Sequence, residues 1–125
     1  MCLLPVVNGL MWSKNMDKTA KIRELNDRAR TTFKNVQVML ALGIRTRPEK
    51  EVSEILERVR TFNEFTPANN PYLENDCACF DYNGDRIIWK FDYYSSSDMQ
   101  YASDDPADPN KTTRVLTIMD AAQDW

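Results

Sequence analysis

The chain has 125 residues, of which 42% are hydrophobic and 28% charged, with a formal net charge of −3. These values fit one soluble globular domain without a membrane span, because no apolar run reaches the roughly 18 residues that a bilayer requires. Three cysteines do not form a disulfide framework, so we expect a cytoplasmic protein. Histidine is absent, which removes the commonest general base and zinc ligand, argues against an enzyme and predicts no cofactor or metal.

The first fifteen residues, Met1–Asn15, contain a short apolar run with no basic residue before Lys14. A signal peptide would place positive charge before that run, so we expect an N-terminal extension, or sequence upstream of a start at Met16. A short edge strand at Leu3–Val7 is the alternative. Residues 16–125 are expected to form a single α+β domain.

A helix is predicted over Asp17–Lys34, with Asp17 as its N-cap. Its apolar stripe consists of Ile22, Leu25, Ala29 and Phe33. Its other face carries Lys18, Lys21, Arg23, Arg28 and Arg30. These cations could contact nucleic acid, but Glu24 and Asp27 lie among them. A solvated face is therefore preferred, and direct nucleic-acid binding is disfavoured.

Two elements follow this helix. The segment Val36–Leu42 is short, apolar and followed by glycine, which indicates a strand buried on both sides. After a connection at Arg45–Pro48, a second helix is predicted, with Thr46 as a cap candidate and Pro48 in its first turn. Its apolar stripe consists of Val52, Ile55, Leu56, Val59 and Phe62, and the acidic residues at its start are Glu49, Glu51 and Glu54.

The pair Asn83-Gly84 separates two runs rich in aromatic and β-branched residues. Both residues tolerate positive φ, so the pattern predicts a type I′ hairpin with strands at Asp76–Tyr82 and Asp85–Tyr94. Strand alternation places Trp89, Phe91 and Tyr93 on one face, and Lys90 with Asp92 on the solvent face. We therefore predict two helices packed on one face of a mostly antiparallel sheet, centred on the hairpin at about 76–94.

Three features of the remaining sequence complete the predicted fold. Cys77 and Cys79 point to one strand face and, without a second ligand pair, are preferred as buried free thiols over a metal site. Residues 66–76 form a polar loop. Thr112–Ala121 is predicted to be a strand because of its β-branched residues, although a helix also fits the spacing.

Acidic residues gather in the second half of the chain. Residues 1–60 hold 12 basic and 7 acidic side chains, whereas residues 61–125 hold 4 and 12. The two halves could neutralise each other, or an acidic face could bind a basic protein surface. Asp105-Pro106 and Asp108-Pro109 are typical of turns. The candidate partner-binding residues are Asp92, Tyr94, Asp98, Asp104, Asp105 and Asp108.

Four segments together resemble a known family. They are Arg23–Asp27, Trp89–Tyr94, Asp105–Pro109 and Thr113–Met119, in this order. The chain from about Thr19 onward is similar to a family of small, uncharacterised bacterial proteins (domain of unknown function, number 3768), carried on proteobacterial chromosomes and plasmids and in phage-related regions. The family has a Glu-His-Asp-Phe-Gly-like segment before the hairpin, where this chain reads Glu74–Ala78 and lacks the histidine. The resemblance implies no established activity.

These observations lead to three functional expectations. The first is a small non-catalytic binding protein of a mobile element, which inhibits a host defence or nucleic-acid-processing complex as an anti-CRISPR or antirestriction protein does. Its partner would be a basic protein surface, in some cases a nucleoprotein complex. The second is a metal-binding protein or small enzyme that uses the carboxylates of Asp76, Asp92, Asp105 and Asp108. The third is a nucleic-acid-binding accessory protein that uses the basic first helix.

Overall fold

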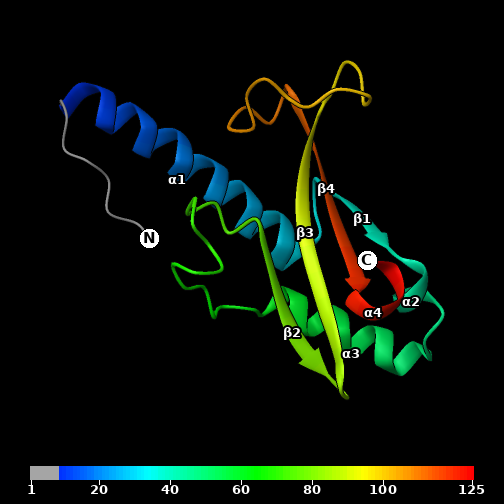
Figure 1. Ribbon diagram of the computed structural model, residues 1–125. Coiled ribbons are helices and arrows are strands. Elements are labelled where there is room, and N and C mark those ends of the chain that lie inside the picture. Colours follow the sequence, from blue (N-terminus) through cyan, green and yellow to red (C-terminus); the bar gives the residue numbers. More distant parts are fainter. Residues whose placement is uncertain (1–8) are drawn as a thin grey trace.

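The computed structural model describes residues 9–125 (Figure 1). Its elements are α1 (Gly9–Thr32), β1 (Gln37–Leu40), α2 (Leu42–Arg45), α3 (Glu49–Arg60), β2 (Cys77–Tyr82), β3 (Asp85–Ser95), β4 (Thr112–Asp120) and α4 (Ala121–Asp124). The strands form one sheet in the order β1-β4-β3-β2, in which β1 and β4 are parallel and the other neighbours antiparallel. The predicted α+β class is confirmed.

One face of the sheet packs on α1 and α3 and contains the core. The register of β3 and β4 places Trp89 beside Ile118 and Phe91 beside Leu116, so that four apolar side chains share the inner face. The helices contribute Ala29, Ile44, Ile55 and Val59 to the same cluster. Trp89 is fully buried and meets Phe62, Phe65 and Phe91 edge to face. The predicted packing of Trp89 and Phe91 against the helices is thus confirmed.

The hairpin forms as the sequence predicts. Asn83 and Gly84 have φ values of 50° and 86°, the left-handed conformation that a type I′ turn needs at both central positions. β3 lies in the middle of the sheet and β2 at its edge, so the hairpin extends from the centre to one edge. On the outer face, Lys90 Nζ lies 2.8 Å from Asp92 Oδ2, and both side chains are partly exposed as predicted.

The first helix differs from its predicted bounds at both ends. It begins at Gly9, so Asp17 lies inside the helix and is not its N-cap. The helix ends before Phe33, whose φ of 57° interrupts the helical backbone. Residues 9–15 of the predicted extension belong to α1, whereas the alternative strand at Leu3–Val7 lies outside the described residues.

Three predictions for residues 36–48 were wrong. The strand β1 is shorter than predicted and is not buried on both sides, because it pairs with β4 alone at the edge of the sheet and Met39 remains 54% exposed. Arg45, predicted to lie in a connection, ends the short helix α2. Thr46 does not cap α3, since Pro48 occupies the N-cap position without a side-chain hydrogen bond. Of the three acidic residues predicted for the start of α3, Glu49 and Glu51 lie in its first turn and Glu54 lies beyond it.

The C-terminal segment forms the predicted strand and then a short helix. β4 ends at Asp120, whose carboxylate accepts a hydrogen bond from the backbone nitrogen of Ala122 at 2.9 Å and so caps α4. Cys77 is half-buried and Cys79 exposed, so the prediction of two buried thiols was wrong. Residues 9–125 contain no helix with the length and hydrophobicity that a membrane span requires.

Candidate functional site

The segment 96–111, which we name the acidic loop, connects β3 to β4 and holds four of the six candidate partner-binding residues. It lies at the end of the sheet opposite the Asn83–Gly84 turn (Figure 1). Asp98 and Asp104 are exposed, and Asp105 and Asp108 are half-buried. Among the ion pairs formed by the side chains of residues 18–125, none involves these four carboxylates. The structure therefore gathers four carboxylates whose charges are not neutralised by a paired cation.

Three of these carboxylates order the loop. Asp98, Asp105 and Asp108 each accept a hydrogen bond from the backbone nitrogen two residues ahead, at 3.0, 3.2 and 2.9 Å. This is the Asx-turn geometry that Asp adopts readily, and it confirms the turn role predicted for Asp105 and Asp108. Each of these carboxylates retains a second oxygen for another donor.

The other two candidates lie on the outer face of β3. Asp92 already forms an ion pair with Lys90. Tyr94 is half-buried and forms a β-bridge with Ala102, which brings it next to the acidic loop. The six predicted residues thus divide into four within the loop, one beside it, and Asp92 further along the strand.

A buried polar cluster, made of Asn26, Glu74, Tyr93 and Arg114, connects the loop to the core. Asn26 is fully buried and donates to the Tyr93 hydroxyl at 2.8 Å and to the Glu74 carbonyl at 3.0 Å. The Tyr93 hydroxyl donates to the Glu74 carboxylate at 2.9 Å. Arg114 donates from Nε to Asn26 at 2.8 Å and from Nη2 to the carbonyl of Pro106. The cluster therefore fixes the acidic loop to α1, β3 and β4.

Burial shifts the acidity of this cluster. Burial raises the pKa of Glu74, and the neighbouring Asp76 carboxylate raises it further, whereas the hydrogen bond from Tyr93 and the charge of Arg114 act in the opposite direction. Burial also raises the pKa of Tyr93 and of Asp76. The hydrogen bonds of Glu74 and Tyr93 are made within the cluster, so its chemistry is that of a structural clamp.

Sequence analysis missed this cluster, although the pattern contained a signal for it. Asn26 lies four residues after Ile22 and three before Ala29, and is therefore on the buried stripe of α1. We assigned Leu25 to that stripe, but Leu25 is only half-buried. Arg114 likewise lies two residues before Leu116 on β4, and therefore on the same inward face of the sheet. A polar residue at an inward position is the feature that could have identified both.

The basic face of α1 is largely occupied by intramolecular contacts. Arg30, predicted to be solvated, is 4% exposed and donates to the carbonyls of Val59, Arg60 and Phe62 at 2.9, 3.2 and 2.9 Å. It completes the C-terminal end of α3, where backbone carbonyls lack helical partners. Arg23 donates to the carbonyl of Leu73 at 2.9 Å. Two of the five cations proposed to contact nucleic acid, Arg23 and Arg30, are therefore already engaged within the protein.

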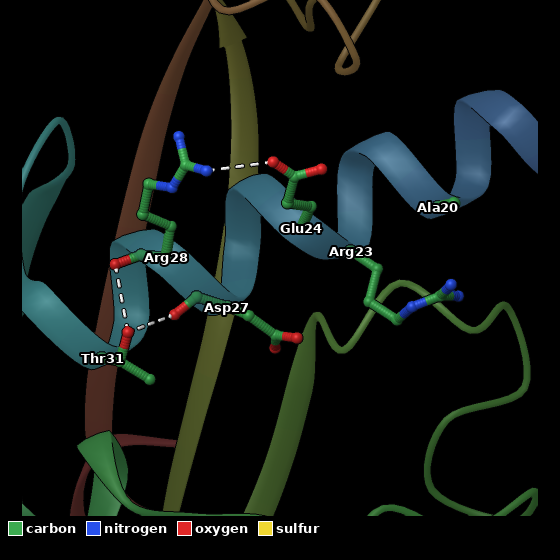
Figure 2. Close-up of a pocket in the computed structure, with 6 residues that line it drawn as sticks. All are labelled: Ala20, Arg23, Glu24, Asp27, Arg28 and Thr31. Carbon is green, nitrogen blue, oxygen red and sulfur yellow. Dashed lines mark hydrogen bonds and ion pairs between the residues drawn. The ribbon is translucent and has the colours of Figure 1, made fainter.

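An open hollow of about 630 Å³ runs along the same helix (Figure 2). Its charged side chains are satisfied within the protein: Arg28 pairs with Glu24 at 3.0 Å, and Asp27 accepts from Asn75 at 2.9 Å. The Thr31 hydroxyl donates to the Asp27 carbonyl at 2.8 Å. This hollow therefore offers few free groups to a ligand.

The carboxylates of the metal hypothesis are not gathered. Asp76 precedes β2, Asp92 lies on β3, and Asp105 and Asp108 lie in the acidic loop. Within the described part of the chain, no group of three or more His, Cys, Asp or Glu residues is placed to hold a metal ion.

Comparison with known proteins supports the resemblance found in the sequence. No curated protein and no solved structure matches the chain significantly. A family model described as "Protein of unknown function (DUF3768)" matches residues 19–123, which include every element of the fold except the start of α1 and the last residues. The chain therefore belongs to the DUF3768 family.

Proposed function

We propose that this protein is a small non-catalytic binding protein of a mobile element, which acts in the cytoplasm through protein–protein contact. The acidic loop is its contact surface, and the partner presents a basic surface to it. The observation that carries this proposal is the exposure of loop carboxylates that form no ion pair with any side chain of residues 18–125. Such groups attract and orient a partner of opposite charge.

Apolar side chains on the same loop support a protein partner. Met99 is 41% exposed and Tyr101 is 66% exposed. Tyr and Met are enriched in protein interfaces, where their apolar surface is removed from water on binding. The acidic loop therefore combines charges that favour encounter with side chains that can be buried after it.

The loop is also held in one conformation before binding. The backbone nitrogens of Ser95, Ser96 and Ser103 donate to the carbonyls of Tyr101, Lys111 and Tyr93 at 2.8, 3.1 and 2.9 Å. The Thr112 hydroxyl donates to the Asp105 carbonyl at 2.9 Å. A preorganised loop loses less conformational entropy on binding than a flexible one.

In its concrete form, the proposal is that the protein inhibits a host defence or nucleic-acid-processing complex, in the manner of an anti-CRISPR or antirestriction protein. Proteins that bind nucleic acid expose lysine and arginine to the phosphate backbone. A rigid acidic loop can occupy such a surface and compete with the nucleic acid for it. Small size, the lack of histidine and the acidic second half of the chain support this form of the proposal.

A set of Asp→Asn substitutions tests the role of charge without removing the turns. Asn supports the same Asx turns as Asp, so replacing Asp98, Asp104, Asp105 and Asp108 by Asn removes four charges while keeping the loop ordered. The control variant replaces Glu49, Glu57 and Glu64 by Gln and Asp81 by Asn, which removes the same charge elsewhere. Tagged wild-type protein and both variants are used to capture partners from host lysate, and captured proteins are quantified.

The proposal predicts that a protein partner recovered with the wild type and the control is lost with the loop variant. Equal recovery by all three proteins would contradict it, because the charges of the acidic loop would then play no part in binding. Circular dichroism and thermal unfolding of the loop variant check that the fold is retained.

A further inference from the structure

A second hollow lies between α1, the end of the acidic loop and the start of β4. It has a volume of about 420 Å³, and we name it the basic groove. Four of its lining residues are cationic: Lys21, Arg28, Lys34 and Arg114. No carboxylate side chain lines it. Arg28 is paired with Glu24, but Lys21, Lys34 and Arg114 have no paired anion among the side chains of residues 18–125, so this concave surface favours an anionic ligand.

Arg114 is the most buried of these cations. It is 5% exposed and lines both the basic groove and a smaller adjoining hollow beside β1. No carboxylate in the part of the chain whose side chains are described, residues 18–125, lies at ion-pair distance from it. A buried guanidinium without a paired anion is costly, and a bound anion would remove that cost.

The guanidinium of Arg114 has one nitrogen to spare. Nε donates to Asn26 and Nη2 to the carbonyl of Pro106, whereas Nη1 has no acceptor within the described chain. These two bonds fix the plane of the guanidinium of Arg114, which lines the groove. Planar, oriented guanidinium groups suit the oxygens of phosphate.

The exposed cations of the groove are arranged around this buried donor. Lys21 and Lys34 are exposed and form no ion pair with the side chains of residues 18–125, whereas Arg28 pairs with Glu24 at 3.0 Å. The side chains of Asn110 and Thr112 also line the groove and add polar groups. We propose that the basic groove binds the phosphate group of a small phosphorylated ligand of nucleotide size.

The size and surroundings of the groove favour a small ligand over a polynucleotide. Its volume lies within the range of about 300–1,000 Å³ that is usual for small-molecule sites. The neighbouring loop carries Asp104, Asp105 and Asp108, which would repel an extended polyanion that leaves the groove on that side. Arg23 and Arg30, the cations that could extend the surface along α1, donate to backbone carbonyls instead.

Calorimetric titration of the full chain at constant ionic strength tests this proposal. The probes are inorganic phosphate, a nucleoside monophosphate, the matching nucleoside and a single-stranded oligonucleotide. The proposal predicts saturable binding of the monophosphate at one site and no binding of the nucleoside. Inorganic phosphate that binds as tightly as the monophosphate would support the site and identify free phosphate as a sufficient ligand.

Substitutions then locate the site. Lys21→Ala and Lys34→Ala change exposed side chains and should each weaken monophosphate binding about tenfold, the expected loss of one charge-assisted contact. Arg114→Lys keeps the charge but loses the planar fork, and should weaken binding more. Lys50→Ala, on an exposed position of α3, is the matched control and should leave binding unchanged.

Three results would overturn the proposal. One is no binding of phosphate or monophosphate by the wild type at millimolar concentration. Another is binding that Lys21→Ala and Lys34→Ala leave unchanged, a result that does not depend on the folding of the Arg114 variant. The third is binding of the oligonucleotide alone, which would identify a nucleic-acid surface instead of a small-ligand site.

Discussion

At the scale of single residues, two buried polar side chains determine how the acidic loop and α3 are held. Arg114 connects α1 to the loop, and Arg30 connects α1 to the end of α3. Both lie over aromatic rings: Arg114 is 5.3 Å from the centroid of Tyr93, and Arg30 is 5.1 Å from that of Trp89. Buried cations of this kind are stabilising only while their hydrogen bonds are complete.

The first prediction concerns Arg30. Replacing it by Met removes three hydrogen bonds to the carbonyls of Val59, Arg60 and Phe62, of which only Val59 keeps another donor, the backbone nitrogen of Phe62. We expect the free energy of unfolding to fall by about 3 kcal/mol. Arg28→Met, on the exposed face of the same helix, is the control and should change it by less than about 1 kcal/mol. Urea denaturation measures both, and equal effects would contradict the assigned role of Arg30.

The second prediction concerns Glu74, whose carboxylate is half-buried beside Tyr93, Asp76 and Arg114. Its folded pKa is raised by burial, so protonation favours the folded state. The resulting stability is present below the unfolded pKa of about 4.3 and is lost as the pH rises through the folded value. Glu74→Gln keeps an acceptor for Tyr93 without the charge. We therefore expect the variant to gain stability relative to the wild type as the pH rises from 4 towards 7.

Urea denaturation of the wild type and Glu74→Gln at several pH values measures this difference. Tyr93→Phe in both backgrounds is the control for the lost hydrogen bond. The wild type and the Gln variant could instead differ in stability by the same amount across this pH range. That result would contradict a pKa of Glu74 raised by burial.

At the scale of elements, the sequence predicted what local chemistry determines and missed what distant contacts determine. The prediction of the hairpin was correct because Asn83 and Gly84 fix the turn by themselves. The edge position of β1 could not be predicted, since it depends on parallel pairing with a strand near residue 115. The polar cluster has the same origin: Asn26 and Arg114 are 88 residues apart and are brought together only by the sheet.

The third prediction concerns the contact between α2 and α4. Gly43 donates its backbone N–H to the Asp124 carboxylate at 2.9 Å, and an added Cβ would lie 2.6 Å from Asp124 Oδ2. Gly43→Ala should therefore displace Asp124 and destabilise the protein by about 1–3 kcal/mol, although Ala is the better helix former. In an Asp124→Ala background, Gly43→Ala should lower the free energy of unfolding by much less.

Thermal unfolding of the wild type, the two single variants and the double variant completes this cycle. An additive result would contradict a steric conflict between Gly43 and Asp124, because residues that do not interact have independent effects on stability.

At the scale of the whole molecule, the fold places two surfaces of opposite charge next to each other, since Pro109 and Asn110 of the acidic loop also line the basic groove. The acidic loop extends beyond one end of the sheet (Figure 1), while the residues that line the basic groove come from α1, the end of that loop and the start of β4. Arg114 and the carbonyl of Pro106 join the two, so the clamp that orders the acidic loop also supplies the floor of the groove. Different variants test the two proposals: the Asp→Asn variant of the acidic loop tests the protein partner, and Lys21→Ala and Lys34→Ala test the phosphate ligand.

The fourth prediction concerns where a protein partner binds. Hydrogen–deuterium exchange of the chain, alone and with the partner recovered by capture, tests the central proposal most directly. We expect the partner to slow amide exchange in residues 96–111 and around Tyr94, and to leave the Asn83–Gly84 turn unchanged. Slower exchange elsewhere in the chain, with unchanged exchange throughout the acidic loop, would contradict the proposal that this loop is the contact surface.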